Sequence, residues 1–362
     1  MRFPEFSGEW ENKRIDEIAP LQRGFDLPTQ DVEDGDYPVV YSNGILKYHK
    51  TYKCEAPGLV TGRSGSIGSF TYISDGKYWP HNTSLWVTDF KNNYPPFIYY
   101  LYQTINISQY ASGSSVPTLN RNDVHRHITY LPTFIEQVKI AKLLVKIDER
   151  IDTQRKIIED LKKLKDAITH FHFRNELTHS PMTYIGQYIT QVSRRNKDTK
   201  IDRVLSVSNK YGFVDQDEQF EDRVVASIDT SNYKVVQKGD FAYNPARINV
   251  GSVAILQEFE NGIVSPMYVC FTTNKELLPA YFELYLSTNI FKHEMYKRLE
   301  GSVRLCLTYE SLCNIKIALP EFSVQTDLAS KVSALLTKIK NEERLLCLYH
   351  NFKQYLLTQM FI

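Results

Sequence analysis

Two short loops of the chain combine arginine with side-chain amides, the residue types that read the edges of DNA bases. One loop contains Gln22 and Arg23, and the other, residues 191–197, contains Arg194 and Arg195. In the major groove, arginine pairs bidentately with guanine, and asparagine or glutamine pairs with adenine. Solvated surface charge is the competing interpretation of both loops, because charged side chains are mostly exposed in any protein.

The polar side chains of such loops are therefore the candidate DNA contacts. They are Gln22, Arg23, Asn43, Arg63, Ser64, Ser66, Ser114 and Ser115 in the first half of the chain, and Ser193, Arg194, Arg195, Lys197, Asn209, Arg247, Asn249 and Arg304 in the second half. The formal net charge is only +1. Because phosphate contacts supply most sequence-independent affinity, any DNA-facing charge must be local, or another subunit must supply the rest.

A glycine-rich segment, Gly62–Gly68, has two interpretations. Its backbone amides could cradle a phosphate or contact a partner, or the segment could be a tight turn. It is not a Walker A loop, because no Gly-Lys-Ser/Thr follows it. It is not a dinucleotide-binding fingerprint either, because no strand-loop-helix unit surrounds it.

No set of residues in the sequence predicts catalysis or metal binding. Tyr94-Pro95-Pro96-Phe97 resembles the Asn/Asp-Pro-Pro-Tyr/Phe motif of amino-methyltransferases, but tyrosine cannot hold the amine that is methylated. A helix start is the better interpretation, because proline suits the first helical turn. His125 and His127 lack carboxylate or cysteine neighbours that would complete a ligand set, so they are expected to be surface histidines.

Composition predicts a cytoplasmic protein with an ordinary core. Hydrophobic residues make up 42% and charged residues 23% of the 362 residues. No apolar run approaches the roughly 18 residues that span a bilayer, and the start lacks the apolar stretch of a secretory signal. The five cysteines are an odd number without a CxxC pair, so buried free thiols are expected.

The sequence contains two copies of one unit of roughly 180 residues. A shift of 183 places Ile67-Gly68-Ser69 on Val250-Gly251-Ser252. After five extra residues in the second copy, a shift of 188 places Leu119 on Leu307 and Ile151 on Ile339. Because the matches keep their order and need one small gap, a tandem duplication explains them.

Each copy has the same predicted plan. A mixed region with short strands comes first, then a short helix opened by proline, over 96–107 or 279–290, and then a strand that ends at Leu131 or Leu319. The predicted strands of the mixed regions are 37–41, 69–73 and 85–87, and 204–207, 253–256 and 268–271.

A long helix ends each copy, over 134–174 and 322–362. Apolar residues recur at steps of three and four in both helices, and polar residues interrupt the two stripes at equivalent places, Gln154 with Glu342 and Lys165 with Lys353. This heptad pattern is typical of a coiled coil and predicts that the helices pack antiparallel. Two ordinary amphipathic helices, each covering its own domain, remain the alternative.

Over nearly its whole length, the chain resembles the specificity subunits of Type I restriction-modification systems. The segments that carry the resemblance are Gly62–Gly68, Gly113–Leu119, Leu131-Pro132, Gln137–Ala141 and Asp148–Asp152. Gly301–Arg304 and Gln325–Ala329 repeat parts of this block more loosely. The second copy has Val324 where the first has Glu136.

The resemblance implies an α+β fold in which two target-recognition domains, residues 1–133 and 175–321, are related by a pseudo-two-fold axis and joined by the helix pair. It implies that each domain reads half of a split DNA sequence and that the helices set the spacer. It also implies contacts to partner subunits, for which the candidate residues are Gln137, Ala141, Leu144, Ile151, Gln325 and Ala329.

The same resemblance implies that this chain is not an enzyme and binds no cofactor. Two modification subunits would bring S-adenosylmethionine, and restriction subunits would use ATP and magnesium. Two rival functions stay open from the residues alone. One is a methyltransferase or nuclease whose site is obscured, and the other is a coiled-coil scaffold or adaptor that is indifferent to DNA sequence.

Overall fold

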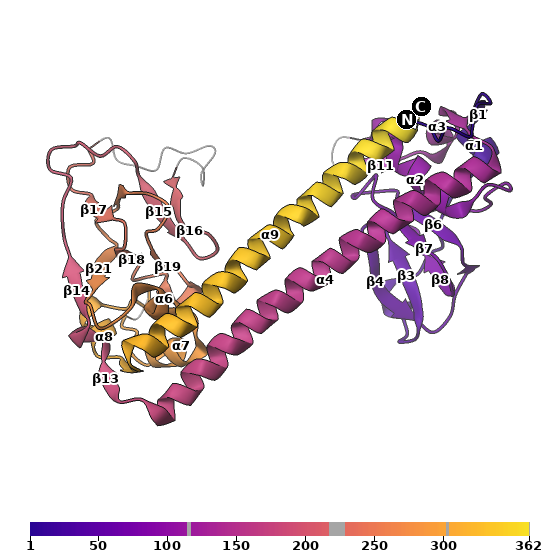
Figure 1. Cartoon of the computed structure of the whole chain (residues 1–362). Helices are drawn as coiled ribbons and strands as arrows, with labels where there is room; N and C mark the ends of the chain where they lie inside the picture. The colour runs from indigo at the N-terminus through magenta and orange to yellow at the C-terminus, as the bar shows by residue number, and fades with distance from the viewer. Residues whose placement is uncertain (114–116, 217–228, 302–303, 362) are drawn as a thin grey trace. The chain divides into compact units, whose positions relative to one another are not determined.

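The computed structural model describes residues 1–113, 117–216, 229–301 and 304–361, which form two compact units. The first unit contains residues 1–156 and 343–362, and the second contains residues 157–342. Helices α4 (Phe134–His179) and α9 (Phe322–Met360) each continue from one unit into the other (Figure 1). Each unit therefore contains a mixed region and one end of both helices.

An antiparallel four-stranded sheet lies at the centre of the first unit. Its strands are, in spatial order, β2 (Leu21–Arg23), β9 (Ser84–Val87), β6 (Gly58–Gly62) and β7 (Phe70–Ile73). Helix α2 (Pro95–Thr104) packs between this sheet and the ends of α4 and α9. Its start after Tyr94, with proline in the first turn, confirms that the Pro-Pro motif is a helix start.

A second sheet of the first unit carries a hairpin. Its order is β4 (Gly44–His49), β3 (Tyr37–Tyr41), β8 (Lys77–Pro80) and β5 (Cys54–Glu55), with β3 and β8 parallel and the other neighbours antiparallel. Val40 and Tyr78 pack with Val60 of the first sheet, so the two sheets share a small core.

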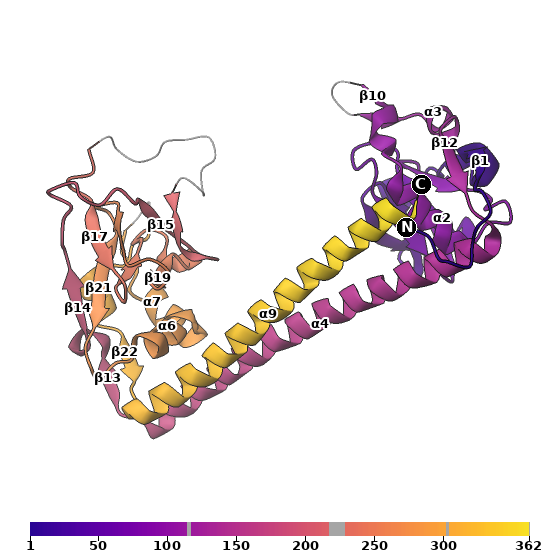
Figure 2. The same cartoon turned by 45° about the horizontal axis from the view of Figure 1, so that its top comes forward.

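The remaining elements of the first unit lie next to the chain's longest helix or close the sheet edge. They are β1 (Glu11–Arg14) paired with β12 (Ile128–Leu131), β10 (Ala111–Ser112) paired with β11 (Thr118–Leu119), the short helices α1 (Ile15–Ile18) and α3 (Arg121–His125), and the 3₁₀ turns η1 (Thr29–Asp31) and η2 (Ile107–Tyr110). Figure 2 shows β10, α3 and β12 together at one end of the unit.

The second unit repeats the central sheet of the first unit and its β1–β12 pair, whereas two separate strand pairs stand in place of the second four-stranded sheet. Its four-stranded sheet has the order β14 (Ile189–Val192), β21 (Val269–Thr273), β18 (Phe241–Tyr243) and β19 (Val253–Ile255). The other pairs are β13 (Met182–Tyr184) with β22 (Lys316–Ala318), β15 (Leu205–Ser208) with β16 (Gly212–Asp215), and β17 (Lys234–Gln237) with β20 (Asn261–Val264). The matching order confirms the duplication, because unrelated chains would not reproduce it.

Helices of the second unit also follow the first, with one difference. Helix α6 (Pro279–Ser287) corresponds to α2, and α8 (Tyr309–Cys313) corresponds to α3. A full helix, α7 (Asn289–Tyr296), stands where the first unit has the turn η2. The 3₁₀ turns are η3 (Ile185–Gln187) and η4 (Ile248–Val250).

The heptad stripes of α4 and α9 face inward in each unit. In the first unit, Ile140, Leu144 and Leu356 are at most 3% exposed and share one core. In the second unit, Phe173 and Val332 are at most 2% exposed and share another. Because the first half of α4 lies in the same unit as the second half of α9, the helices run antiparallel, as predicted.

Two details differ from the expectations. Helix α4 ends at His179 rather than at residue 174, because Glu176 is still buried and Ser180 donates a hydrogen bond to its carboxylate before Pro181 stops the helix. All five cysteines are free thiols, and Cys54 and Cys270 are buried as expected, but Cys347 is exposed on α9. Among the described residues, no helix has both the length and the apolar character that a membrane crossing requires.

Candidate nucleic-acid interface

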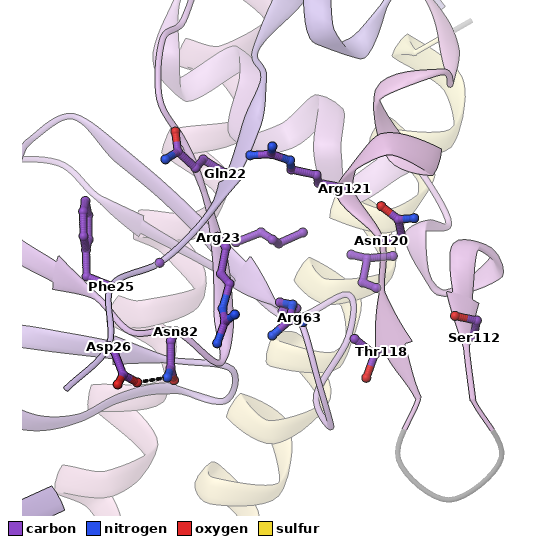
Figure 3. Close-up of a pocket in the computed structure, with 13 residues that line it drawn as sticks. Gln22, Arg23, Phe25, Asp26, Arg63, Asn82, Ser112, Thr118, Asn120 and Arg121 are labelled. Carbon is purple, nitrogen blue, oxygen red and sulfur yellow. Dashed lines mark hydrogen bonds between the residues drawn. The ribbon is translucent and has the colours of Figure 1, made fainter. Parts of the chain in front are cut away.

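A hollow of about 850 Å³ lies in the first unit where the central sheet meets β10, β11 and α3. We call it the first hollow. It is lined by Gln22, Arg23, Gly24, Phe25, Asp26, Arg63, Asn82, Leu85, Ser112, Thr118, Leu119, Asn120 and Arg121. Figure 3 shows that the labelled side chains come from segments far apart in the sequence and enter the same space. The hollow therefore depends on tertiary folding.

The sheet holds two arginines of the first hollow on either side of one strand. Arg23 is opposite Leu85 in the ladder of β2 and β9, and Gly62 is opposite Ser84 in the ladder of β6 and β9. Arg63 directly follows Gly62, and both main-chain groups of Arg63 are used: its N–H donates to Thr83 O at 2.9 Å, and its carbonyl accepts from Leu119 N at 2.7 Å. The backbone at both arginines is thus fixed.

Gly24 fixes the path of the chain beyond Arg23. A Cβ atom at this position would lie 2.2 Å from the carbonyl oxygen of His81 and 2.5 Å from that of Pro80. Only glycine allows the backbone to pass so close to β8. The chain can therefore turn directly after Arg23 and form the wall of the hollow.

Three guanidinium groups of the first hollow lack internal partners. Within the described ranges, the side chains of Arg23, Arg63 and Arg121 form no ion pair or hydrogen bond. Elsewhere in the same unit, Arg2 and Arg14 each contact a carboxylate. Unpaired arginines gathered in one concave place create a local positive potential, which attracts phosphate or the acceptor-rich edge of a base.

Amide groups complete the polar lining. Asn82 donates a hydrogen bond to Asp26, so the one carboxylate among the lining residues is engaged (Figure 3). Asn120 accepts from the backbone N–H of Asn122 at 3.0 Å, which leaves its amide donor available. Gln22 is exposed beside Arg23.

The second unit has a smaller hollow, of about 320 Å³. We call it the second hollow. Its lining residues are Leu205, Ser206, Val207, Ser208, Asn209, Gln216, Tyr233, Arg247, Val250, Ser252, Ser265, Met267 and Tyr268. Arg247 is its one cation, and Asn209 lies in the turn between β15 and β16. Ser252 donates to Val207 O at 2.9 Å, so part of the hydroxyl lining stabilises the fold.

The structure brings some of the predicted DNA contacts together and separates others. Gln22, Arg23 and Arg63 line the first hollow, and Asn209 and Arg247 line the second. Those that line neither are Asn43, Ser64, Ser66, Ser193, Arg194, Arg195, Lys197, Asn249 and Arg304. Ser114 and Ser115, with Val116, Ser302 and Val303, lie outside the described residues.

Sequence reasoning missed Asn82, Ser112, Thr118, Asn120 and Arg121 in the first hollow. One signal was present: Asn120-Arg121 has the same combination of amide and arginine as Gln22-Arg23. The remaining residues carry no such pattern, because their position depends on how β8 to β11 fold together.

The glycine-rich segment is a tight turn. The backbone N–H groups of Gly62, Ser64 and Ile67 donate to Ser69, Thr83 and Gly65, respectively. A Cβ atom at Gly62 would lie 2.2 Å from the Ser66 carbonyl oxygen, so the turn folds back closely on itself. These amides are therefore not free to cradle a phosphate, and the segment contributes to the first hollow through the Arg63 side chain.

The loop at Arg194 and Arg195 is largely occupied by the fold. Arg194 forms an ion pair with Asp240, whose side chain is 8% exposed, and donates to Gln237 Oε1 at 2.5 Å. Arg195 donates to Asn232 Oδ1 at 3.1 Å. Arg194 therefore compensates the charge of a buried carboxylate while its own side chain stays 40% exposed, and its contact with DNA stays a prediction.

Replacing Arg194 with alanine should lower the free energy of unfolding of the second unit by about 1–2 kcal/mol, because Asp240 would lose its charged partner. Hydrogen exchange of the backbone amides of β17 and β18, recorded at increasing urea concentration, measures this change. Arg195→Ala is the matched control and should have almost no effect. An Arg194→Ala protein of unchanged stability would show that Asp240 does not depend on Arg194.

Three half-buried histidines belong to the first unit. Burial lowers the pKa of His81, His125 and His127 below the usual value for histidine. His125 Nε2 accepts a hydrogen bond from the backbone N–H of Leu21 at 2.9 Å, beside Arg23, so its neutral form is required there. The expectation that His125 and His127 are surface histidines is thus wrong, because both stabilise the fold: His127 Nδ1 lies 2.8 Å from the Tyr110 hydroxyl.

Acid should therefore destabilise the first unit. A histidine whose pKa is lowered by folding contributes stability above its unfolded pKa of about 6.5, and that stability is lost as the pH falls through the folded pKa. Nearby charges modify the pKa of His125 in both directions, since Asp16 raises it and Arg121 and Arg14 lower it. We expect the urea midpoint to fall between about pH 7.5 and 5.5, and to fall less in His125→Gln.

Tryptophan fluorescence isolates this effect, because Trp10, Trp79 and Trp86 are the three tryptophans of the chain and all belong to the first unit. In the second unit, burial raises the pKa of Glu283 to about 7, which acts in the opposite direction with pH. Far-UV circular dichroism would report the unfolding of both units together, so it cannot isolate the first unit. An identical pH dependence in the wild type and His125→Gln would show that His125 does not contribute.

The residues expected to bind partner subunits are mostly buried inside their own units. Gln137, Ala141, Leu144, Ile151 and Gln325 are at most 3% exposed. Ala329 is half-buried. The assignment is therefore wrong for the five buried residues, because their side chains cannot reach another chain.

The two glutamines instead fix the start of each long helix. Gln137 accepts from Tyr94 N at 2.9 Å and donates to Asn93 Oδ1 at 2.9 Å and to Pro132 O at 3.0 Å. Gln325 accepts from Leu278 N at 2.8 Å and donates to two carbonyl oxygens, those of Glu276 and Pro320. Each glutamine joins the start of the long helix to the loop that precedes the short proline-initiated helix.

Glu136 explains one difference between the copies. Its carboxylate is fully buried and accepts two hydrogen bonds of 2.7 Å from the guanidinium group of Arg2. The corresponding residue of the second copy is Val324. Valine carries no charge, so Val324 needs no partner such as Arg2.

The described part of the chain offers no cluster of three or more His, Cys, Asp or Glu side chains for a metal ion. What the two units share is a concave, polar and locally cationic or amide-bearing surface beside an antiparallel sheet. A concave surface with unpaired arginines is typical of nucleic-acid-binding proteins.

Comparison with known proteins agrees with this class. Residues 7–163 match the family described as Type I restriction modification DNA specificity domain. Over 172 residues the chain is 22% identical to the Type I restriction enzyme EcoprrI specificity subunit of Escherichia coli, and this alignment covers 46% of the chain and 42% of that protein. The aligned region is thus less than half of that relative.

Solved structures extend the likeness of the fold to the whole chain. The S subunit of a Type I restriction-modification system from M. genitalium aligns with 100% of this chain and 99% of its own, with 17% identity and a TM-score of 0.64. A chain from a study of complex assembly and conformational transition in the Type I R-M system aligns with 98% of both chains, with 13% identity and a TM-score of 0.56. The whole chain therefore shares the fold of these S subunits, and its residues 7–163 are similar to the Type I restriction modification DNA specificity domain.

Proposed function

We propose that this chain reads a split DNA sequence for a Type I restriction-modification complex, with each unit contacting one half-site. The observation that carries the proposal is the set of unpartnered arginines and amides in the first hollow, together with the second hollow in the other unit. Because the two hollows differ in their lining residues, the two half-sites should differ in sequence.

The helix pair would set the number of unread base pairs between the half-sites. Both α4 and α9 continue from one unit into the other, and a continuous helix is a stiff connection. DNA readers on one duplex must match its helical repeat, so a fixed connection selects one spacer length.

Chemistry would come from other subunits. We propose that this chain is a non-catalytic reader in the cytoplasm that positions two modification subunits, which bring S-adenosylmethionine, and restriction subunits, which use ATP and magnesium. Large exposed apolar side chains on the long helices support such contacts, because contiguous exposed apolar patches mark interaction sites. They include Ile135, Leu348, Phe352 and Tyr355 in the first unit and Leu164, Leu336 and Phe171 in the second.

Mapping of methylated adenines in the host genome tests the proposal. Deletion of the gene should remove methylation from one split sequence, and its return on a plasmid should restore the same sequence. A methylation pattern unchanged by the deletion would contradict the proposal and favour an adaptor that is indifferent to DNA. Methylation of DNA by the purified chain alone would instead establish an enzyme.

A further inference from the structure

The two hollows differ in the chemistry that they present. The first contains three arginines without internal partners, and two of them, Arg23 and Arg63, are held by the central sheet. Of its apolar residues, Leu85 and Leu119 are 2% and 1% exposed and offer little surface to a ligand, whereas Phe25 is half-buried. The arginines are therefore the strongest hydrogen-bond donors of the first hollow, beside the amide of Gln22, which can both donate and accept.

The second hollow presents a different set. Arg247 is accompanied by the amide of Asn209 and by two exposed apolar side chains, Val250 and Met267, which are 53% and 60% exposed. An amide can pair with adenine, and apolar groups can contact the methyl group of thymine.

The two surfaces suit different base edges in the major groove. Guanine presents two acceptors, N7 and O6, to which the two parallel N–H groups of an arginine fit. Adenine presents a donor beside its acceptor, and cytosine presents a donor, so an arginine, which only donates, is less suited to them. Asp26 could accept from cytosine, and Asn82 already donates to one of its two carboxylate oxygens.

We propose that the first unit reads a half-site containing guanine through Arg23 and Arg63, whereas Arg121 contacts a phosphate at the rim. The inference rests on the proposed function and specifies the bases that this unit selects. Arg121 differs from the other two because it is exposed at the first residue of the short helix α3 rather than held in the sheet.

Binding of the complex with its modification subunits to duplexes of the mapped target tests the assignment. Single guanines are replaced by 7-deazaguanine, which lacks the N7 acceptor and keeps Watson–Crick pairing. Wild-type complex should lose roughly 5- to 150-fold in affinity at the guanine that Arg23 or Arg63 reads. Arg23→Ala or Arg63→Ala should lose a similar factor on the natural duplex and lose nothing more when that guanine is changed.

Two variants serve as controls. Arg121→Ala should weaken binding to all duplexes by a similar factor and reduce the slope of log affinity against log salt by about one. The loss of affinity in Arg247→Ala should depend only on base changes in the other half-site. This result identifies the half-site that the first unit contacts. Tryptophan fluorescence verifies that the variants of the first unit are folded.

The outcomes separate the two levels of the proposal. A first half-site without a G·C pair, or losses in Arg23→Ala and Arg63→Ala that are uniform over all sequences, would overturn guanine reading and leave sequence-specific binding intact. Equal binding of the wild-type complex to every duplex would overturn the proposed function itself. If the variant of either arginine loses affinity on the natural duplex but loses nothing more when one particular guanine is changed, the inference is established.

Discussion

Replacing Gln137 with alanine should lower the free energy of unfolding of the first unit by about 3 kcal/mol. The side chain is 2% exposed and makes three hydrogen bonds, so its loss leaves Tyr94 N–H and Pro132 C=O without a partner in a buried place. Each buried polar group without a partner costs about 1–3 kcal/mol. Urea denaturation followed by tryptophan fluorescence measures the change in the first unit.

The duplication supplies a matched experiment in the same molecule. Gln325→Ala removes the equivalent three hydrogen bonds from the second unit, so hydrogen exchange should show the larger loss of protection there. Gln109, which is exposed, provides the control in the first unit, and its replacement by alanine should change stability by less than about 0.5 kcal/mol. If Gln137→Ala leaves stability unchanged but abolishes assembly with partner subunits, the assignment to partner contact would be right after all.

This glutamine pair illustrates what a repeat in the sequence can and cannot predict. The shift of 188 residues aligned Gln137 with Gln325 correctly, and both accept from the backbone N–H just before the short helix and donate to the carbonyl of the proline five residues earlier. The repeat could not indicate which way the side chains point. Equivalence is a property of the sequence, whereas exposure depends on the loops that pack over the helix start.

The long helices were predictable because their signal is local. Residues three and four apart lie on one helix face, so the stripe that includes Leu144 and Ile151 is visible in the sequence and buried in the structure. Local signals also existed for the true end of α4, since Pro181 disfavours a helical residue before it. The earlier end at residue 174 overlooked this signal.

Candidate DNA contacts were harder to predict because their signal is compositional. The sequence marked both Arg23 and Arg194 for the same reason, yet Arg23 is free and Arg194 is paired with Asp240, which is 46 residues away. Nothing in the loop at Arg194 reveals that partner. The first hollow likewise needs β2 beside β9, a pairing that no local pattern specifies.

A heptad inserted into both long helices should abolish methylation at the natural target and produce methylation at a target with the same half-sites and a longer spacer. Repeating residues 151–157 in α4 and 343–349 in α9 keeps the apolar stripes in phase, and the hydrogen bond between Arg155 and His350 shows that these segments face each other. Seven residues add about 10 Å of helix, which equals roughly three base pairs of rise.

The same insertion made in α4 alone is the control, because it breaks the register of the helix pair and should destabilise the protein rather than select a new target. Methylated adenines mapped in cells that carry each variant provide the measurement. The half-sites should stay unchanged in the double insertion, because neither hollow includes a residue of α4 or α9. Altered half-site letters, or methylation retained at the natural spacing, would mean that the helices do not set the spacer.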